Sequence, residues 1–155
     1  MPREWKDRDL KTPEHDKIML ALMDKETWKR IICKIFDIPK VYILEIEPEY
    51  PITAGRYDDQ IIGFLDFRVV YWYQSHDYQN LYCEIKITEP SFGSVLRQIK
   101  RYQSYMYYSA KNTDCWLVIS PYKDWENPLQ SQKILWLSTN DIAPKTRKDF
   151  KPDEE

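Results

Sequence analysis

Three charged residues in two neighbouring apolar segments have the types and the spacing of a metal-dependent hydrolytic site. Glu84 and Lys86 are two residues apart within the run 81–87, and Asp66 lies in the preceding run 60–70. Side chains two positions apart in a strand share a face and are separated by about 7 Å. Two carboxylates with positions left for water suit Mg²⁺ or Mn²⁺. A lysine beside them can orient or deprotonate a water.

The alternative for Glu84 and Lys86 is an ordinary surface pair. A solvated charge pair contributes only about 0–1 kcal/mol, and charged residues are common enough for such triplets to arise by chance. Strands nevertheless disfavour Glu and Lys at central positions, and the alternating apolar residues of 81–87 predict that the opposite face is buried. The chemical interpretation therefore depends on whether Asp66 approaches the pair.

An antiparallel hairpin would bring Asp66 to Glu84. The polar residues 74–80 are turn-prone and can join two strands, and counting back from this turn puts Asp66 within reach of Glu84. Gly63, inside the first of these strands, predicts a bulge or a close backbone approach. Alternation places three apolar side chains on the face opposite Asp66: Leu65, Phe67 and Val69.

In this order, the residues resemble the motif of the PD-(D/E)XK nuclease superfamily. That motif consists of an acid on one strand, the triplet (Asp/Glu)-x-Lys on the next strand, and a helix after it. Here the acid is Asp66 in Gly-Phe-Leu-Asp, the triplet is Glu84-Ile85-Lys86, and the helix begins near Ser91.

The predicted helix extends the resemblance. Its Gln98 and Tyr102 are similar to the Gln-x-x-x-Tyr motif of the exonuclease-like branch, and in element order the resemblance covers residues 14–139. The small size and the richness in Tyr, Ile and Trp are similar to compact nucleases encoded by archaeal filamentous viruses.

The resemblance implies a metal-dependent nuclease that hydrolyses phosphodiester bonds of DNA, with double-stranded DNA the favoured partner. The metal, Mg²⁺ or Mn²⁺, would be bound by Asp66, Glu84 and the backbone carbonyl of Ile85. Lys86 would act on the attacking water, and Gln98 would position that water or a phosphate.

Glu14, in the first predicted helix, is a candidate for a further metal ligand, because the superfamily often places an acid of this helix near the metal. Its alternative role is a favourable interaction with the N-terminus of the helix dipole. His15 and His76 have no partner at ligand spacing in the sequence, and we expect them in a helix start and in a turn.

Four residues of the helix after the triplet are predicted to contact DNA: Arg97, Lys100, Arg101 and Tyr102. The net charge of −2 excludes a protein that coats nucleic acid by bulk charge, so a DNA enzyme would need local cations. The alternatives are ordinary solvation for the cations and core packing for Tyr102. Two other function classes stay open: a catalytically inactive nucleic-acid-binding or interaction protein on the same fold, and a structural or inhibitory protein.

The predicted fold class is α/β, a mixed central β-sheet flanked by helices in the order α-β-β-β-α-β-(α)-β, with a restriction endonuclease-like core. Thr12 and Pro13 predict a helix start, and Asp24 leaves open whether one helix or two precede the first strand. The strands are expected at 41–47, 60–73, 80–88, 115–120 and 134–137, with a loop at 48–59. Further helices are expected at 91–110 and within 124–132.

At 155 residues the chain is long enough for one domain with a real core, which we expect at 12–140 between a flexible start at 1–11 and a charged tail at 141–155. Three widely spaced cysteines fit neither a zinc site nor a disulfide framework. No segment resembles a signal peptide or a membrane span, so we predict no membrane partner and a cytoplasmic location (the host cytoplasm for a viral protein). The many tyrosines permit a homodimer without requiring it.

Overall fold

A five-stranded mixed sheet forms the centre of the fold in the computed structural model, which describes residues 12–54, 60–74, 78–88, 91–106 and 114–142. The strands lie in the order β1-β2-β3-β4-β5. Neighbouring strands are antiparallel from β1 to β3 and parallel from β3 to β5. Their bounds are β1 Tyr42–Ala54, β2 Gln60–Trp72, β3 Gln79–Ile85, β4 Cys115–Ser120 and β5 Leu135–Ser138.

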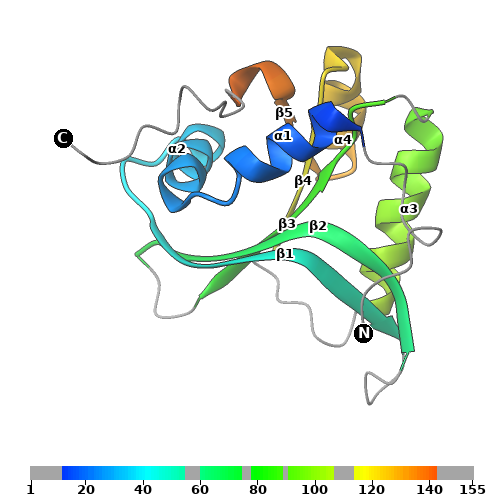
Figure 1. Ribbon diagram of the computed structural model, residues 1–155, viewed down its shortest axis with the longest axis horizontal. Coiled ribbons are helices and arrows are strands. Elements are labelled where there is room, and N and C mark those ends of the chain that lie inside the picture. The colour runs from blue at the N-terminus through cyan, green and yellow to red at the C-terminus, as the bar shows by residue number, and fades with distance from the viewer. Residues whose placement is uncertain (1–11, 55–59, 75–77, 89–90, 107–113, 143–155) are drawn as a thin grey trace.

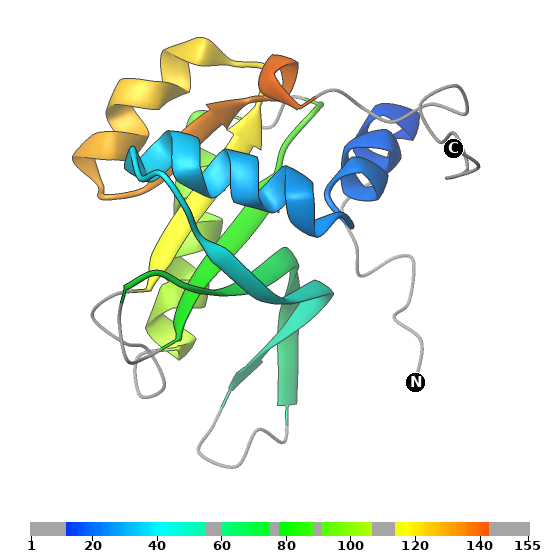
Figure 2. The same cartoon turned by 90° about the vertical axis from the view of Figure 1, so that its left-hand side faces the viewer.

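Helices cover both faces of the sheet (Figure 1). Figure 2 shows α2 in front of the strands and α3 behind them. The α-helices are α1 Pro13–Ala21, α2 Lys25–Phe36, α3 Phe92–Tyr105 and α4 Glu126–Ser131, and the short 3-10 helices are η2 Lys123–Trp125 and η3 Thr139–Asp141.

Side-chain caps determine where three of the helices begin. The Thr12 hydroxyl accepts from the backbone N–H of His15, and the Ser91 hydroxyl accepts from that of Ser94. Asp24 accepts from the backbone N–H of Thr27 at 3.0 Å. Such caps satisfy N–H groups that have no partner within the helix. Asp24 therefore starts a second helix, and two helices precede β1 where the predicted order had one.

Two hydrophobic clusters lie on opposite faces of the sheet. The first joins α1 and α2 to the sheet through Trp28, Ile32 and Phe67, and the second joins α3 and α4 to the sheet through Ile99, Leu129 and other side chains. Ile142, two residues beyond the predicted end of the domain, is 1% exposed in the first cluster. The predicted α/β class with a mixed central sheet is confirmed.

The first strand differs most from the prediction. We predicted a loop at 48–59, but β1 continues through Pro48 and Pro51 to Ala54. β1 lies at the edge of the sheet, which is where strands tolerate proline. Prolines and glutamates on an edge also discourage pairing with another sheet. We therefore expect any homodimer to form through a different surface.

The hairpin of β1 and β2 is irregular beside Asp66. Glu49, which lies between the paired positions on either side of Asp66, has a left-handed backbone with φ of 51°. Beyond this point the ends of β1 and β2 extend away from the rest of the sheet (Figure 2). The prediction that Leu65 and Phe67 share a face is wrong, because Leu65 packs in the second cluster and Phe67 in the first. Regular alternation therefore fails across Asp66.

Both features predicted for a glycine inside a strand, a bulge and a close backbone approach, occur at Gly63. The register of β1 with β2 shifts beside it and leaves Ile62 without a paired residue, as in a bulge. The ring of Tyr102 lies directly against its backbone, so that a Cβ at this position would be 2.8 Å from Cε1 and 2.9 Å from Cζ. The close approach is therefore to α3.

We expect Gly63→Ala to destabilise the protein by about 1–3 kcal/mol, the usual cost of overpacking, because the buried Tyr102 ring has to move. Gly93→Ala is the matched control. A Cβ there meets only the flexible end of Arg97, with Nη1 at 3.3 Å, so this change should be neutral or stabilise α3 by up to about 1 kcal/mol. Urea unfolding measures both, and a Gly63→Ala variant as stable as wild type would contradict the packing.

No helix in the described part of the chain is long and apolar enough to cross a membrane.

Candidate active site

Asp66 and Glu84 meet where the backbone pairing of β2 with β3 ends. The last paired residues are Phe67 and Cys83. Beyond this pair, carboxylate side chains accept the hydrogen bonds of backbone N–H groups in place of backbone carbonyls. The backbone N–H of Ile85 donates to Asp66 Oδ2 at 2.7 Å, and that of Asp66 donates to Glu84 Oε1 at 3.1 Å. Each carboxylate thus satisfies a buried N–H that the diverging strands leave open, which fixes the orientation of both groups.

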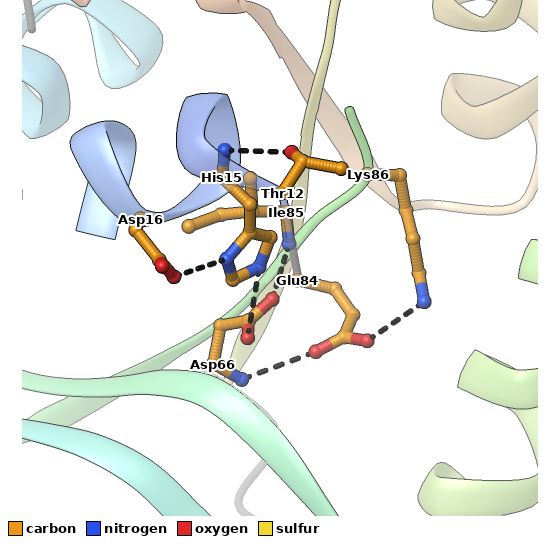
Figure 3. A network of polar contacts seen from close by, with 7 residues as sticks. All are labelled: Thr12, His15, Asp16, Asp66, Glu84, Ile85 and Lys86. Atoms are coloured by element: carbon orange, nitrogen blue, oxygen red, sulfur yellow. Dashed lines mark hydrogen bonds and ion pairs between the residues drawn. The ribbon is translucent and has the colours of Figure 1, made fainter. Parts of the chain in front are cut away.

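The other carboxylate oxygens face nitrogen atoms of two further side chains (Figure 3). Lys86 Nζ lies 3.2 Å from Glu84 Oε2, and His15 Nε2 lies 3.4 Å from Asp66 Oδ1. Glu84 lies between Asp66 and Lys86, so the three charged groups form a row with His15 next to Asp66. The predicted approach of Asp66 to Glu84 is confirmed.

Burial decides against an ordinary surface pair. The exposed fractions are 4% for Asp66, 4% for Glu84, 8% for Lys86 and 5% for His15. Charged groups are rarely this buried, because removal from water costs several kcal/mol per ion, roughly, even after relaxation. The alternative of a solvated strand face does not hold for Glu84 and Lys86.

The first helix places His15 at the site and leaves Glu14 in solvent. Glu14 is exposed on α1, while His15 is buried and its other ring nitrogen, Nδ1, lies 3.8 Å from Asp16 Oδ1. The prediction that His15 lies in a helix start is confirmed, and its contact with Asp66 comes from a distant element rather than from ligand spacing in the sequence. His76 lies outside the described residues.

Sequence periodicity could not choose between Glu14 and His15. His15 stands three residues before the buried Ile18, and Glu14 stands four residues before it, so both spacings put a side chain near the buried stripe of α1. The cap at Thr12 fixes where the helix begins but not how it is rotated against β2. That rotation depends on how α1 packs on the sheet.

The predicted residues Gln98 and Tyr102 of α3 contact each other, and Tyr102 also contacts β2. Gln98 Nε2 donates to Tyr102 Oη at 3.2 Å, and Tyr102 packs on Gly63, three residues before Asp66. Tyr102 is 5% exposed in the second cluster, which favours the core role left open for it. Three cations stand exposed on the helix: Arg97, Lys100 and Arg101.

The donor set at the site fits a hard divalent cation of the Mg²⁺ type. Such ions take oxygen ligands, and one or two carboxylates are enough when waters and phosphates complete the coordination. No three His, Cys, Asp or Glu side chains in the described chain gather around one point that could hold a metal. A metal at Asp66 and Glu84 would therefore depend on main-chain oxygen, water and substrate for its other ligands.

Cys83 does not add a soft ligand to this set. It is fully buried in the first cluster, on the face of β3 opposite Tyr82. Burial, and then the charges of Asp66 and Glu84, raise the pKa of the Cys83 thiol well above its usual value. Since the thiolate is the form that binds metals and attacks electrophiles, Cys83 is inert in both respects.

Comparison with known proteins leaves the family open. No protein-family model matches the chain, and no curated protein matches it. Among solved structures, the chain is similar to the crystal structure of a repair endonuclease from Pyrococcus abyssi, with 14% sequence identity and a TM-score of 0.49. The match covers 89% of this chain and 50% of that chain, so this chain spans about half the length of that protein. A likeness at this level assigns neither family nor activity, and the function has to be inferred from the residues of the site.

Proposed function

We propose that the protein is a metal-dependent nuclease that hydrolyses phosphodiester bonds of DNA, with double-stranded DNA favoured. One observation carries the proposal: the carboxylates of Asp66 and Glu84 and the ammonium of Lys86 meet, buried, where two strands separate. Buried ion pairs are weak contributors to stability, because the cost of desolvation offsets their attraction. A row of three such groups therefore favours a chemical role.

The residues of the row, the backbone of Ile85 and the side chain of Gln98 each have a role in this proposal. Asp66, Glu84 and the carbonyl oxygen of Ile85 would hold Mg²⁺ or Mn²⁺. Such an ion supplies a bound water of lowered pKa and neutralises charge on the phosphate. Lys86 would orient the attacking water and offset negative charge in the transition state. Gln98 would position that water or a phosphate oxygen.

The exposed cations of α3 would contact the DNA backbone. Arg97, Lys100 and Arg101 project from the side of the helix opposite its buried residues, where they can reach phosphates without disturbing the core. A restriction endonuclease-like core is part of the proposal. The antiparallel β1–β2–β3, followed by α3 and the parallel β4, supports it.

Cleavage of linear and circular double-stranded DNA tests the proposal. We expect cleavage with Mg²⁺ or Mn²⁺ and none with EDTA. Cleavage of the linear DNA alone would indicate attack from ends. Undiminished cleavage in EDTA would contradict the metal mechanism. A folded protein that binds DNA in a salt-sensitive manner without cutting it would instead support the alternative of an inactive nucleic-acid-binding protein.

We expect His15→Ala to lower the cleavage rate by about 10–100-fold, the usual effect of removing a group that orients a metal ligand. His15 contacts one oxygen of Asp66 and the backbone N–H of Ile85 donates to the other, so loss of His15 removes one of the contacts that orient the carboxylate. Glu14→Ala, one residue away and exposed, should cleave at the wild-type rate. Single-turnover cleavage measures both. An equal loss of cleavage rate in the two variants would indicate that Glu14 also acts at the site. Full activity of His15→Ala would exclude this role for His15.

A further inference from the structure

Lys86 stands one residue beyond β3, so its position depends on what holds the chain after Ile85. Its own backbone N–H donates to the carbonyl oxygen of Ile119 in β4 at 2.9 Å. The carbonyl oxygen of the next residue, Ile87, accepts from the phenolic hydroxyl of Tyr122 at 3.0 Å. One bond precedes the Cα of Lys86 and the other follows it, and together they attach the strand end to β4 and the turn after it.

Tyr122 is itself held at its backbone and at its ring. Its backbone N–H donates to Ser120 Oγ at 3.2 Å, and the fully buried Ser120 also accepts from the indole Nε1 of Trp136 at 2.8 Å. The Tyr122 ring packs on that of Trp125, with 4.8 Å between the centroids. Because the ring and backbone are both fixed, the hydroxyl is a donor at a defined place. The bond joins residues 35 positions apart in the chain.

We propose that Tyr122 is a positioning residue for Lys86. Its hydroxyl holds the strand end so that the Lys86 ammonium stays beside Glu84, where Nζ lies 3.2 Å from Oε2. The role in catalysis depends on the proposed nuclease function. A lysine side chain is long and flexible, so the backbone anchor decides where its ammonium can reach. Small displacements at such a group are costly, since about 1 Å can lower a rate by as much as about 10²-fold.

Tyr122→Phe removes the hydroxyl and keeps the ring on Trp125, and Tyr42→Phe is the matched control because Tyr42 is 60% exposed at the start of β1. We expect kcat for DNA cleavage to fall about 10-fold in Tyr122→Phe with KM unchanged, because the cations of α3 are untouched. The backbone amides of residues 86–88 should exchange hydrogen faster. Tyr42→Phe should change neither quantity. If Tyr122 had a purely structural role, Tyr122→Phe would lower the melting temperature and leave kcat unaltered at temperatures below it.

Unchanged kcat, or unchanged exchange at 86–88, in the Tyr122→Phe variant would overturn the positioning role. A rise in KM with constant kcat would also overturn it. If the wild-type protein cleaves no DNA, the proposed function fails and the catalytic role with it. The exchange comparison then still decides whether Tyr122 fixes the segment that carries Lys86.

Discussion

Glu84→Gln should lower DNA cleavage by about 10³-fold, the scale on which removal of a key electrostatic group acts. Glutamine keeps an oxygen that can accept the backbone N–H of Asp66, so the junction of β2 and β3 retains its geometry. The substitution removes the charge that a divalent ion requires and that faces Lys86. The loss should therefore appear in kcat, with DNA affinity nearly unchanged. Single-turnover rates and fluorescence anisotropy with labelled duplex DNA measure the two quantities.

Glu26→Gln is the control for this substitution. The side chain of Glu26 is 76% exposed in the first turn of α2, and we expect wild-type cleavage from this variant. Circular dichroism at the assay temperature establishes that Glu84→Gln is folded. A folded Glu84→Gln variant that cleaves DNA at more than about a tenth of the wild-type rate would exclude Glu84 from the chemistry, given the loss expected for such a group.

The stability of the Glu84–Lys86 pair should show strong coupling. The side chains are 5% and 9% exposed, so removing either partner costs the other buried charge this ion pair. We expect Lys86→Met and Glu84→Gln each to lower the free energy of unfolding by about 3–5 kcal/mol. The double variant Glu84→Gln/Lys86→Met removes both charges and should be more stable than either single variant. Urea denaturation of the four proteins gives the coupling energy.

Additive effects would contradict this description of the pair. If the double variant loses the sum of the two single losses, the groups do not interact in the folded protein. The double variant should also be inactive even where it is as stable as wild type. That combination would identify the pair as functional, because selection retains a costly charge pair only where something other than stability requires it.

Local patterns were sufficient to predict the elements around the site. Apolar alternation in 81–87 and the polar turn before it predict β3 and its hairpin with β2, and these bring Asp66 to Glu84. The continuous apolar run of Cys115–Ser120 predicts a central strand, since such strands are buried on both faces. The caps at Thr12, Asp24 and Ser91 predict helix starts from chemistry within one turn.

Features that depend on tertiary packing could not be predicted in this way. The break in alternation at Asp66 lies opposite the left-handed Glu49 on the neighbouring strand, and nothing in the β2 sequence marks it. The approach of His15 to Asp66 needs the rotation of α1 on the sheet, and the bond from Tyr122 to Ile87 joins segments far apart in the chain. Edge position, which lets β1 include two prolines, is likewise a property of the whole sheet.

The most direct test of the account is the location of Mn²⁺ in a crystal of the protein, by anomalous scattering at the manganese absorption edge. The account predicts a peak within bonding distance of carboxylate oxygens of both Asp66 and Glu84, at the divergence of β2 and β3, and its loss in Asp66→Asn. No peak at this place, or a peak bound by other residues in a protein that cleaves DNA with Mn²⁺, would contradict the assignment of these two carboxylates as the metal site.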